Sequence, residues 1–166
     1  MAAVQTSKLK ANRIIGIDYG LKRIGIAVSD ENKIIAIPVM TLIAEEKTEN
    51  TVTKLITTLQ KKAEEGQYEV NGIVIGLPLM MSGKMGFLAD EVKHFIELMR
   101  KACSIPIVTW DERLSTVQAE RSLREGGMSR KKRSKVVDTI TAVIILQNFL
   151  DYKKIQQTLS ESNQMP

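Results

Sequence analysis

The sequence predicts an α/β domain in which a mixed β-sheet carries helices on its faces. Two observations indicate this class. Three runs rich in Ile and Val near the N-terminus are separated by short polar turns, which is typical of antiparallel hairpin strands. Two later apolar runs each follow a helical pattern, which is typical of buried parallel strands. One sheet that contains both groups, with the helices packed on it, gives the mixed architecture.

The three hairpin strands are predicted at residues 13–19, 23–29 and 33–39. The segments DYGLK and DENK between them are rich in turn-forming residues. Pro38 fits best near an end or an edge of its strand, because proline cannot donate a hydrogen bond to a neighbouring strand.

Helices and strands alternate in the rest of the chain. The two buried strands are NGIVIG and IPIVTW. Apolar spacing predicts helices within residues 45–66, 87–102, 115–127 and 135–152. In the third of these, Ser115 and Gln118 fit a capping box at the start. The segment MSRKKRSK before the last helix is predicted to be a basic loop.

The length of 166 residues suits one domain, which we place at residues 13–153, with flexible tails at 1–12 and 154–166. No apolar run approaches the roughly 18 residues that a membrane span requires. The N-terminal segment has no apolar core of a secretory signal.

Cys103 is the only cysteine, which excludes an intrachain disulfide and favours a reducing compartment. We therefore expect a cytoplasmic protein without a membrane contact.

Acidic residues stand out at three places in this pattern. Asp18 ends the first strand, Asp111 and Glu112 end the last strand, and Asp138 lies within the apolar helix VVDTITAVIIL. Ligands of α/β proteins bind at the carboxyl ends of the strands. The sequence therefore predicts that these acids meet at one edge of the sheet.

Each acid also has an ordinary structural interpretation. Asp18 could cap the turn DYG, Asp111 and Glu112 could begin a solvated loop, and Asp138 could be exposed or paired with a nearby Arg or Lys. Together, however, clustered carboxylates repel one another, and a divalent cation relieves this repulsion. Because the only histidine, His94, lies in an amphipathic helix without a partner, Mg²⁺ or Mn²⁺ is favoured over Zn²⁺.

Basic residues gather next to these acids, in a protein with a formal net charge of +5. A solvated charged loop is one interpretation of this segment, and a clamp for the phosphates of nucleic acid is the other. Its position directly before Asp138 favours the clamp. The Gly-rich loop GLPLMMSGKMG lacks a Walker A pattern, and Lys84 within it could contact a phosphate. The candidate nucleic-acid-binding residues are Lys84, Arg113, Arg121, Arg130, Lys131, Lys132, Arg133 and Lys135.

Four ordered motifs resemble a known family. GIDYGLKRIGIAVSD, the loop GLPL with its following glycines, DERLST with AERSLRE, and SRKKR followed by VDTITAVIILQNFL look like the YqgF family of Holliday-junction-resolvase-like proteins. The resemblance runs from about Arg13 to Asp151. It implies an RNase H-like fold with a mixed five-stranded sheet, and metal-dependent nuclease chemistry. It also implies processing of the 5′ end of pre-16S ribosomal RNA, or resolution of DNA junctions.

By position in the motifs, Asp18, Glu112 and Asp138 correspond to the catalytic, metal-binding carboxylates of this family. Asp111 is the alternative to Glu112, because neighbouring strand residues face opposite sides and only one should point inward. The loop departs from the family pattern GLPLNMDG, since Met80 and Ser82 replace its Asn and Asp. This departure leaves the role of the loop open.

Other functions remain alternatives at this point. GIDYG resembles the phosphate loop of actin-like phosphotransferases, but those enzymes need two such domains and this chain has room for one. A non-catalytic nucleic-acid-binding module is the third hypothesis. The sequence does not choose between structured RNA and DNA junctions, or between a monomer and a homodimer, although a four-way junction would suit a symmetric dimer.

Overall fold

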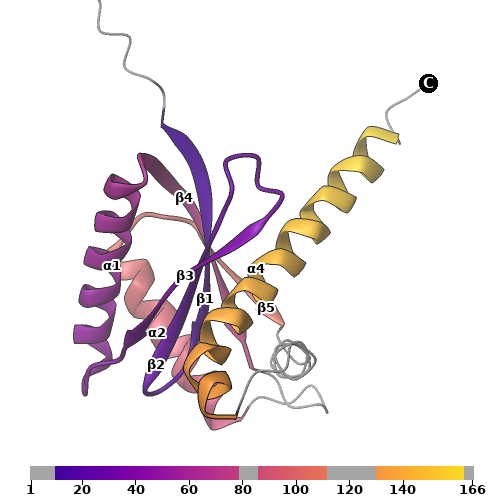
Figure 1. Ribbon diagram of the computed structural model, residues 1–166. Helices are drawn as coiled ribbons and strands as arrows, with labels where there is room; N and C mark the ends of the chain where they lie inside the picture. Colours follow the sequence, from indigo (N-terminus) through magenta and orange to yellow (C-terminus); the bar gives the residue numbers. More distant parts are fainter. Residues whose placement is uncertain (1–9, 79–85, 112–129, 163–166) are drawn as a thin grey trace, which may run out of the picture.

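The computed structural model of the protein describes residues 10–78, 86–111 and 130–162 (Figure 1). Within them a five-stranded sheet has the order β3-β2-β1-β4-β5. The first three strands pair antiparallel, and β1 pairs with β4 and β4 with β5 in parallel. This arrangement confirms the predicted mixed sheet. The strands are β1 Ala11–Tyr19, β2 Arg23–Ser29, β3 Ala36–Ile43, β4 Tyr68–Leu77 and β5 Ile107–Asp111.

Helices cover both faces of the sheet. Figure 1 shows α1 (Thr48–Glu65) and α2 (Phe87–Ala102) on one face and α4 (Arg130–Ser162) across the other. Each side has its own apolar core. The larger core joins β-strand residues to α1 and α2, and the smaller one joins the opposite face of the sheet to α4.

The alternation of side chains along β1 assigns its residues to these two cores. Ile15, Ile17 and Tyr19 belong to the core on the side of α1 and α2. Gly16 faces α4 instead, because a Cβ added there would lie 2.6 Å from the Cβ of Leu146. Successive strand residues point to opposite faces, so Asp18 belongs to the same face as Gly16.

The third strand lies further along the chain than residues 33–39, where we predicted it. The carboxylate of Asp30 accepts hydrogen bonds from the backbone N–H groups of Ile34 and Ile35, at 2.6 and 2.8 Å. These bonds hold residues 30–35 in a turn, and the strand begins only at Ala36. Pro38 lies in the edge strand β3 next to a register shift, as its missing N–H requires.

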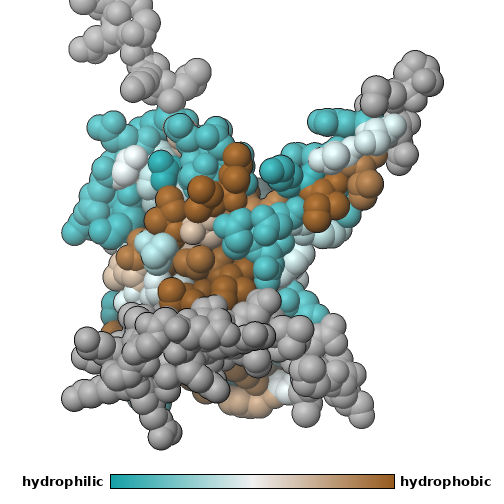
Figure 2. All heavy atoms as spheres, turned by 45° about the vertical axis from the view of Figure 1, so that its right-hand side comes forward, coloured by the Kyte–Doolittle hydropathy of each residue, from teal (hydrophilic) through white to brown (hydrophobic). Residues whose placement is uncertain are grey.

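The last helix is longer at both ends than we predicted. It begins at Arg130, so the predicted basic loop is helical from that residue onward, because Arg and Lys are good helix formers. It continues to Ser162 through residues 154–162, which we expected to belong to a flexible tail. Residues 151–162 are all exposed, and Figure 2 shows this end of α4 standing clear of the body.

The helix that we predicted at residues 115–127 lies outside the described residues, and so do residues 79–85 of the Gly-rich loop. None of the helices in the described residues is long and apolar enough to cross a bilayer.

Candidate functional site

The register of the sheet places Asp18 at the end of a row that continues with two small residues. Asp18 on β1 pairs with Gly25 on β2, and Gly25 pairs with Thr41 on β3. Because residues in register face the same side of a sheet, this row lies under α4. Gly25 has no side chain, so a helix can approach the sheet closely at this row.

Helix α4 crosses the sheet directly over this row. A Cβ added to Gly25 would lie 1.9 Å from the backbone carbonyl oxygen of Asp138. The next helical residue is also anchored here, because the hydroxyl oxygens of Thr139 and Thr41 are 2.7 Å apart and share a hydrogen bond. Asp138 is therefore at the same level of the sheet as Asp18, and on the same face.

The Asp138 carboxylate is largely desolvated, with its side chain 20% exposed. Its Oδ2 atom lies 3.0 Å from Nε of Arg23. The two atoms are within ion-pair distance, but Oδ2 accepts no hydrogen bond from any described residue. Burial raises the pKa of Asp138 above its ordinary value, and the Arg23 guanidinium lowers it in part. The site holds a carboxylate with unused acceptor capacity.

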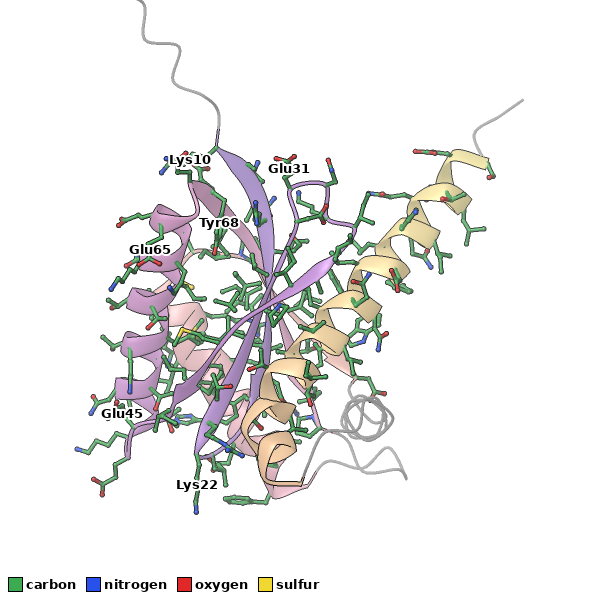
Figure 3. The ribbon with its side chains drawn as sticks, viewed as in Figure 1. Lys10, Lys22, Glu31, Glu45, Glu65 and Tyr68 are labelled. Carbon is green, nitrogen blue, oxygen red and sulfur yellow. The ribbon has the colours of Figure 1, made fainter. Side chains whose placement is uncertain are left out.

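Arg23 is the residue at this site that the sequence reasoning missed. The ordinary interpretation of Asp138 included pairing with a nearby Arg or Lys, but Arg23 is remote from it in the chain and begins β2. A signal was present, because Arg23 follows the turn after Asp18 within one motif. Lys22 in that turn points away from the body at the same end of the molecule (Figure 3).

The strand β5 ends beside this row at Asp111. Trp110 belongs to the core on the α4 side, where its ring packs edge-on against Phe149 with centroids 5.7 Å apart. Ile107 packs with the opposite core. By alternation, Asp111 faces the same side as Ile107 and away from α4. Glu112, which we predicted as the metal ligand, lies outside the described residues.

The structure thus brings two of the three predicted carboxylates together. Asp18 and Asp138 share one face and one level of the sheet. Among the described residues no group of three metal-ligating side chains is complete. Glu112, the third predicted carboxylate, lies outside those ranges.

The predicted phosphate-binding residues fall into two groups. Arg130, Lys131, Lys132, Arg133 and Lys135 lie in the first turns of α4, and the backbone of this segment leads directly to Asp138. Lys84, Arg113 and Arg121 lie outside the described residues, as do Met80 and Ser82 of the Gly-rich loop.

The strand order, the two helix layers and the helix crossing above Asp18 define an RNase H-like α/β fold. A solved structure of this fold is the yeast mitochondrial Holliday junction resolvase Ydc2, with a TM-score of 0.50 and 12% identity. The similarity covers 86% of this chain and 79% of that one. At this identity the likeness concerns the fold alone.

The family follows from the sequence itself. The family model described as "RuvX: Holliday junction resolvase" matches residues 12–152, and the chain belongs to this family. A relative from Protochlamydia amoebophila, named "Putative pre-16S rRNA nuclease", is 60% identical over 87% of this chain and 97% of its own length. A protein of the same name from Halothermothrix orenii is 43% identical over 85% of this chain and 96% of its own. The resemblance that the motifs indicated is confirmed.

Proposed function

We propose that the protein is a Mg²⁺- or Mn²⁺-dependent endonuclease that hydrolyses phosphodiesters of structured RNA in 5′-end processing of pre-16S ribosomal RNA. The observation that carries the proposal is the placement of Asp18 and Asp138 on one face and one level of the sheet. Membership of the family and the names of the relatives support it. The proposal places this ribosomal RNA processing in the cytoplasm.

The described residues fit a divalent cation. The buried Oδ2 of Asp138 accepts no hydrogen bond from them and lies in a setting where burial disfavours its charge. Such an oxygen gains from a cation, and Mg²⁺ prefers oxygen ligands. Arg23 supplies a positive charge at 3.0 Å, which partly balances the carboxylate.

In this proposal Asp18, Asp138 and Glu112 hold the metal. We choose Glu112 over its neighbour because Asp111 shares the face of Ile107, away from α4. Divalent ions bound there would supply an activated water and stabilise the charge that develops on the phosphate oxygens. The chain's own contribution is to fix the carboxylates: Gly25 allows α4 to approach, and the Thr41–Thr139 hydrogen bond sets its position.

Substrate binding would use the basic turns at the start of α4. Five Arg and Lys residues between 130 and 135 precede Asp138 on the same helix. Cations at this position attract the phosphate backbone without reading base sequence. Lys22 lies at the same end of the molecule and would extend this contact (Figure 3).

The test is cleavage of a pre-16S ribosomal RNA fragment with Mg²⁺, with Mn²⁺ and with chelator. Asp18→Asn and Asp138→Asn should each abolish the metal-dependent cleavage. Asp90→Asn is the matched control, because Asp90 is an exposed carboxylate on α2, on the opposite side of the sheet. Cleavage that survives chelator, or that the first two variants perform as well as the wild type, would contradict the proposal.

Resolution of four-way DNA junctions is the second candidate, favoured by the description of the matching family. The same assay with a four-way junction separates the two substrates. Faster symmetric cleavage of the junction than of the RNA would favour this candidate. Binding of both substrates without cleavage under any metal would identify a non-catalytic nucleic-acid-binding module.

A further inference from the structure

A concave surface lies far from the acidic site, between the turn at residues 30–35 and the end of α4. Figure 2 shows it as a notch beside the projecting end of the helix. The groove has a volume of about 420 Å³. It is lined by Ile14, Asn32, Lys33, Ile34, Leu150, Lys153, Lys154 and Gln157.

The charge of the groove has one sign. Three of its lining residues are lysines, two are amides and none is a carboxylate. The nearby acids are directed elsewhere or engaged. Asp30 accepts backbone N–H groups of its own turn, Asp151 accepts from Gln147, and Glu31 lies at the hairpin tip (Figure 3). Lysines and amides are the groups that contact phosphate and sugar oxygens.

Hydrogen bonds hold the turn that forms one wall of the groove and tie it to α4, the helix that forms the other. The Asp30 carboxylate holds the turn at Ile34 and Ile35. The Gln147 side chain ties this turn to α4: its Oε1 accepts from the N–H of Ala36 at 2.9 Å, and its Nε2 donates to the carbonyl of Ile34 at 2.8 Å. A turn held in this way lowers the entropy cost of binding, because this wall of the groove is already formed.

Helix α4 connects this groove to the acidic site as a spacer of known length. Asp138 and Lys153 lie on the same helix. The fifteen residues between their positions correspond to roughly 22 Å at about 1.5 Å per residue. Phosphates follow one another roughly every 3 Å along a duplex. A duplex that runs along α4 from Asp138 would reach the groove after roughly seven base pairs.

We propose that this groove binds the phosphate backbone of the nucleic-acid substrate about seven base pairs from the cleaved bond, through Lys33, Lys153 and Lys154. The inference rests on the proposed function and specifies its substrate as one with a duplex of at least that length. An acidic protein segment is the other occupant that a basic groove could take. The amides beside the lysines and the shared helix with the acidic site favour nucleic acid.

The test compares two RNA stem-loops, with stems of about 4 and about 14 base pairs, the longer of which alone spans the roughly 22 Å. Binding is measured in chelator over a series of salt concentrations, so that cleavage does not intervene. The variant replaces Lys33, Lys153 and Lys154 with Gln. The control replaces Lys61, Lys93 and Lys101 with Gln, since these exposed lysines lie on α1 and α2 across the sheet and their loss changes the net charge equally.

For the long stem, the groove variant should lower the slope of log K against log salt by roughly 2 to 3, because each lost phosphate contact removes roughly 0.7–0.9. The short stem and the control variant should show no such change. An unchanged slope for the long stem, or an equal fall for both stems, would overturn the inference, and an acidic protein would then be the occupant to examine. Absence of cleavage with Mg²⁺ would contradict the proposed nuclease activity. The salt dependence of binding, measured in chelator, would still test the groove.

Discussion

Gly25 lies so close beneath Asp138 that a Cβ at this glycine would be 1.9 Å from the Asp138 carbonyl oxygen. No side chain fits between the strand and the helix at this point. The contact sets the height of α4 above the sheet and, through it, the position of Asp138 at the level of Asp18. A methyl group here therefore affects stability and the site together.

Gly25→Ala should destabilise the protein by about 1–3 kcal/mol or more, because α4 must move to admit the methyl group. Denaturant unfolding measures the loss. Gly72→Ala is the matched control, since the nearest atom to its added Cβ is Cγ1 of Ile14 at 3.9 Å, an ordinary contact. Equal stabilities of the two variants would show that the helix does not rest on Gly25.

Asp138→Asn should gain stability relative to the wild type as the pH rises. Burial raises the folded-state pKa of Asp138 above its ordinary value of 3.8, and Arg23 opposes this only in part. Below that ordinary value both the folded and the unfolded chain hold the proton. Above it the unfolded chain loses the proton first, so the stability that the protonated group contributes is lost as pH rises through the raised pKa. Unfolding free energies measured from pH 3.5 to 7 without divalent ions check this trend.

Asp30→Asn provides a comparison of opposite sign. The backbone N–H groups of Ile35 and Ile34 lower the pKa of the Asp30 carboxyl below 3.8. Its contribution to stability is therefore present above that value and is lost as pH falls through the lowered pKa. The wild type should exceed Asp30→Asn at neutral pH and lose this advantage in acid. If the stability difference from the wild type changed with pH in the same direction for Asp30→Asn and Asp138→Asn, the opposite pKa shifts of the two carboxyls would be contradicted.

Mg²⁺ should raise the melting temperature of the wild type, because the cation binds the folded carboxylates and not the unfolded chain. At a concentration of 100 times the dissociation constant the stabilisation is about 2.7 kcal/mol. Asp18→Asn and Asp138→Asn should lose most of this shift, and Asp90→Asn should retain it. Thermal unfolding in Mg²⁺, measured against chelator, distinguishes a metal site from a general effect of salt, for which NaCl at equal ionic strength is the control.

The sequence predicted the mixed sheet correctly, because the signals of its strands are local. The structure places Asp18 and Asp138 on one face, as expected, and their role as metal ligands stays a prediction. Apolar runs with turn residues between them define strands, and Asp18 and Asp138 are conspicuous within apolar segments. The predicted ends of the third strand and of the last helix were wrong. The third strand begins late because Asp30 holds the N–H groups of Ile34 and Ile35, a competition that apolar spacing does not reveal.

Apolar spacing does not predict side-chain contacts between residues that are far apart in the sequence. Arg23 pairs with Asp138, and Gln147 binds Ala36, across more than one hundred residues in each case. Only the packing of α4 on β2 and β3 creates these pairs. The helix itself also extends past its apolar stretch, since apolar spacing reports the buried part of a helix and not the exposed turns that good helix formers add.

Gln147→Leu should separate the turn at residues 30–35 from α4. The substitution keeps a side chain of similar size and removes the partners of the Ala36 N–H and the Ile34 carbonyl. Ala36 is buried, so its amide is left without water or protein acceptor, at a cost of about 1–3 kcal/mol. Gln156→Leu is the control, because Gln156 is exposed on the same helix. Hydrogen exchange of the Ala36 amide should accelerate in Gln147→Leu and not in Gln156→Leu, because only the first variant removes the acceptor of that amide. An Ala36 amide that stays as protected as in the wild type would show that Gln147 does not fix this wall of the groove.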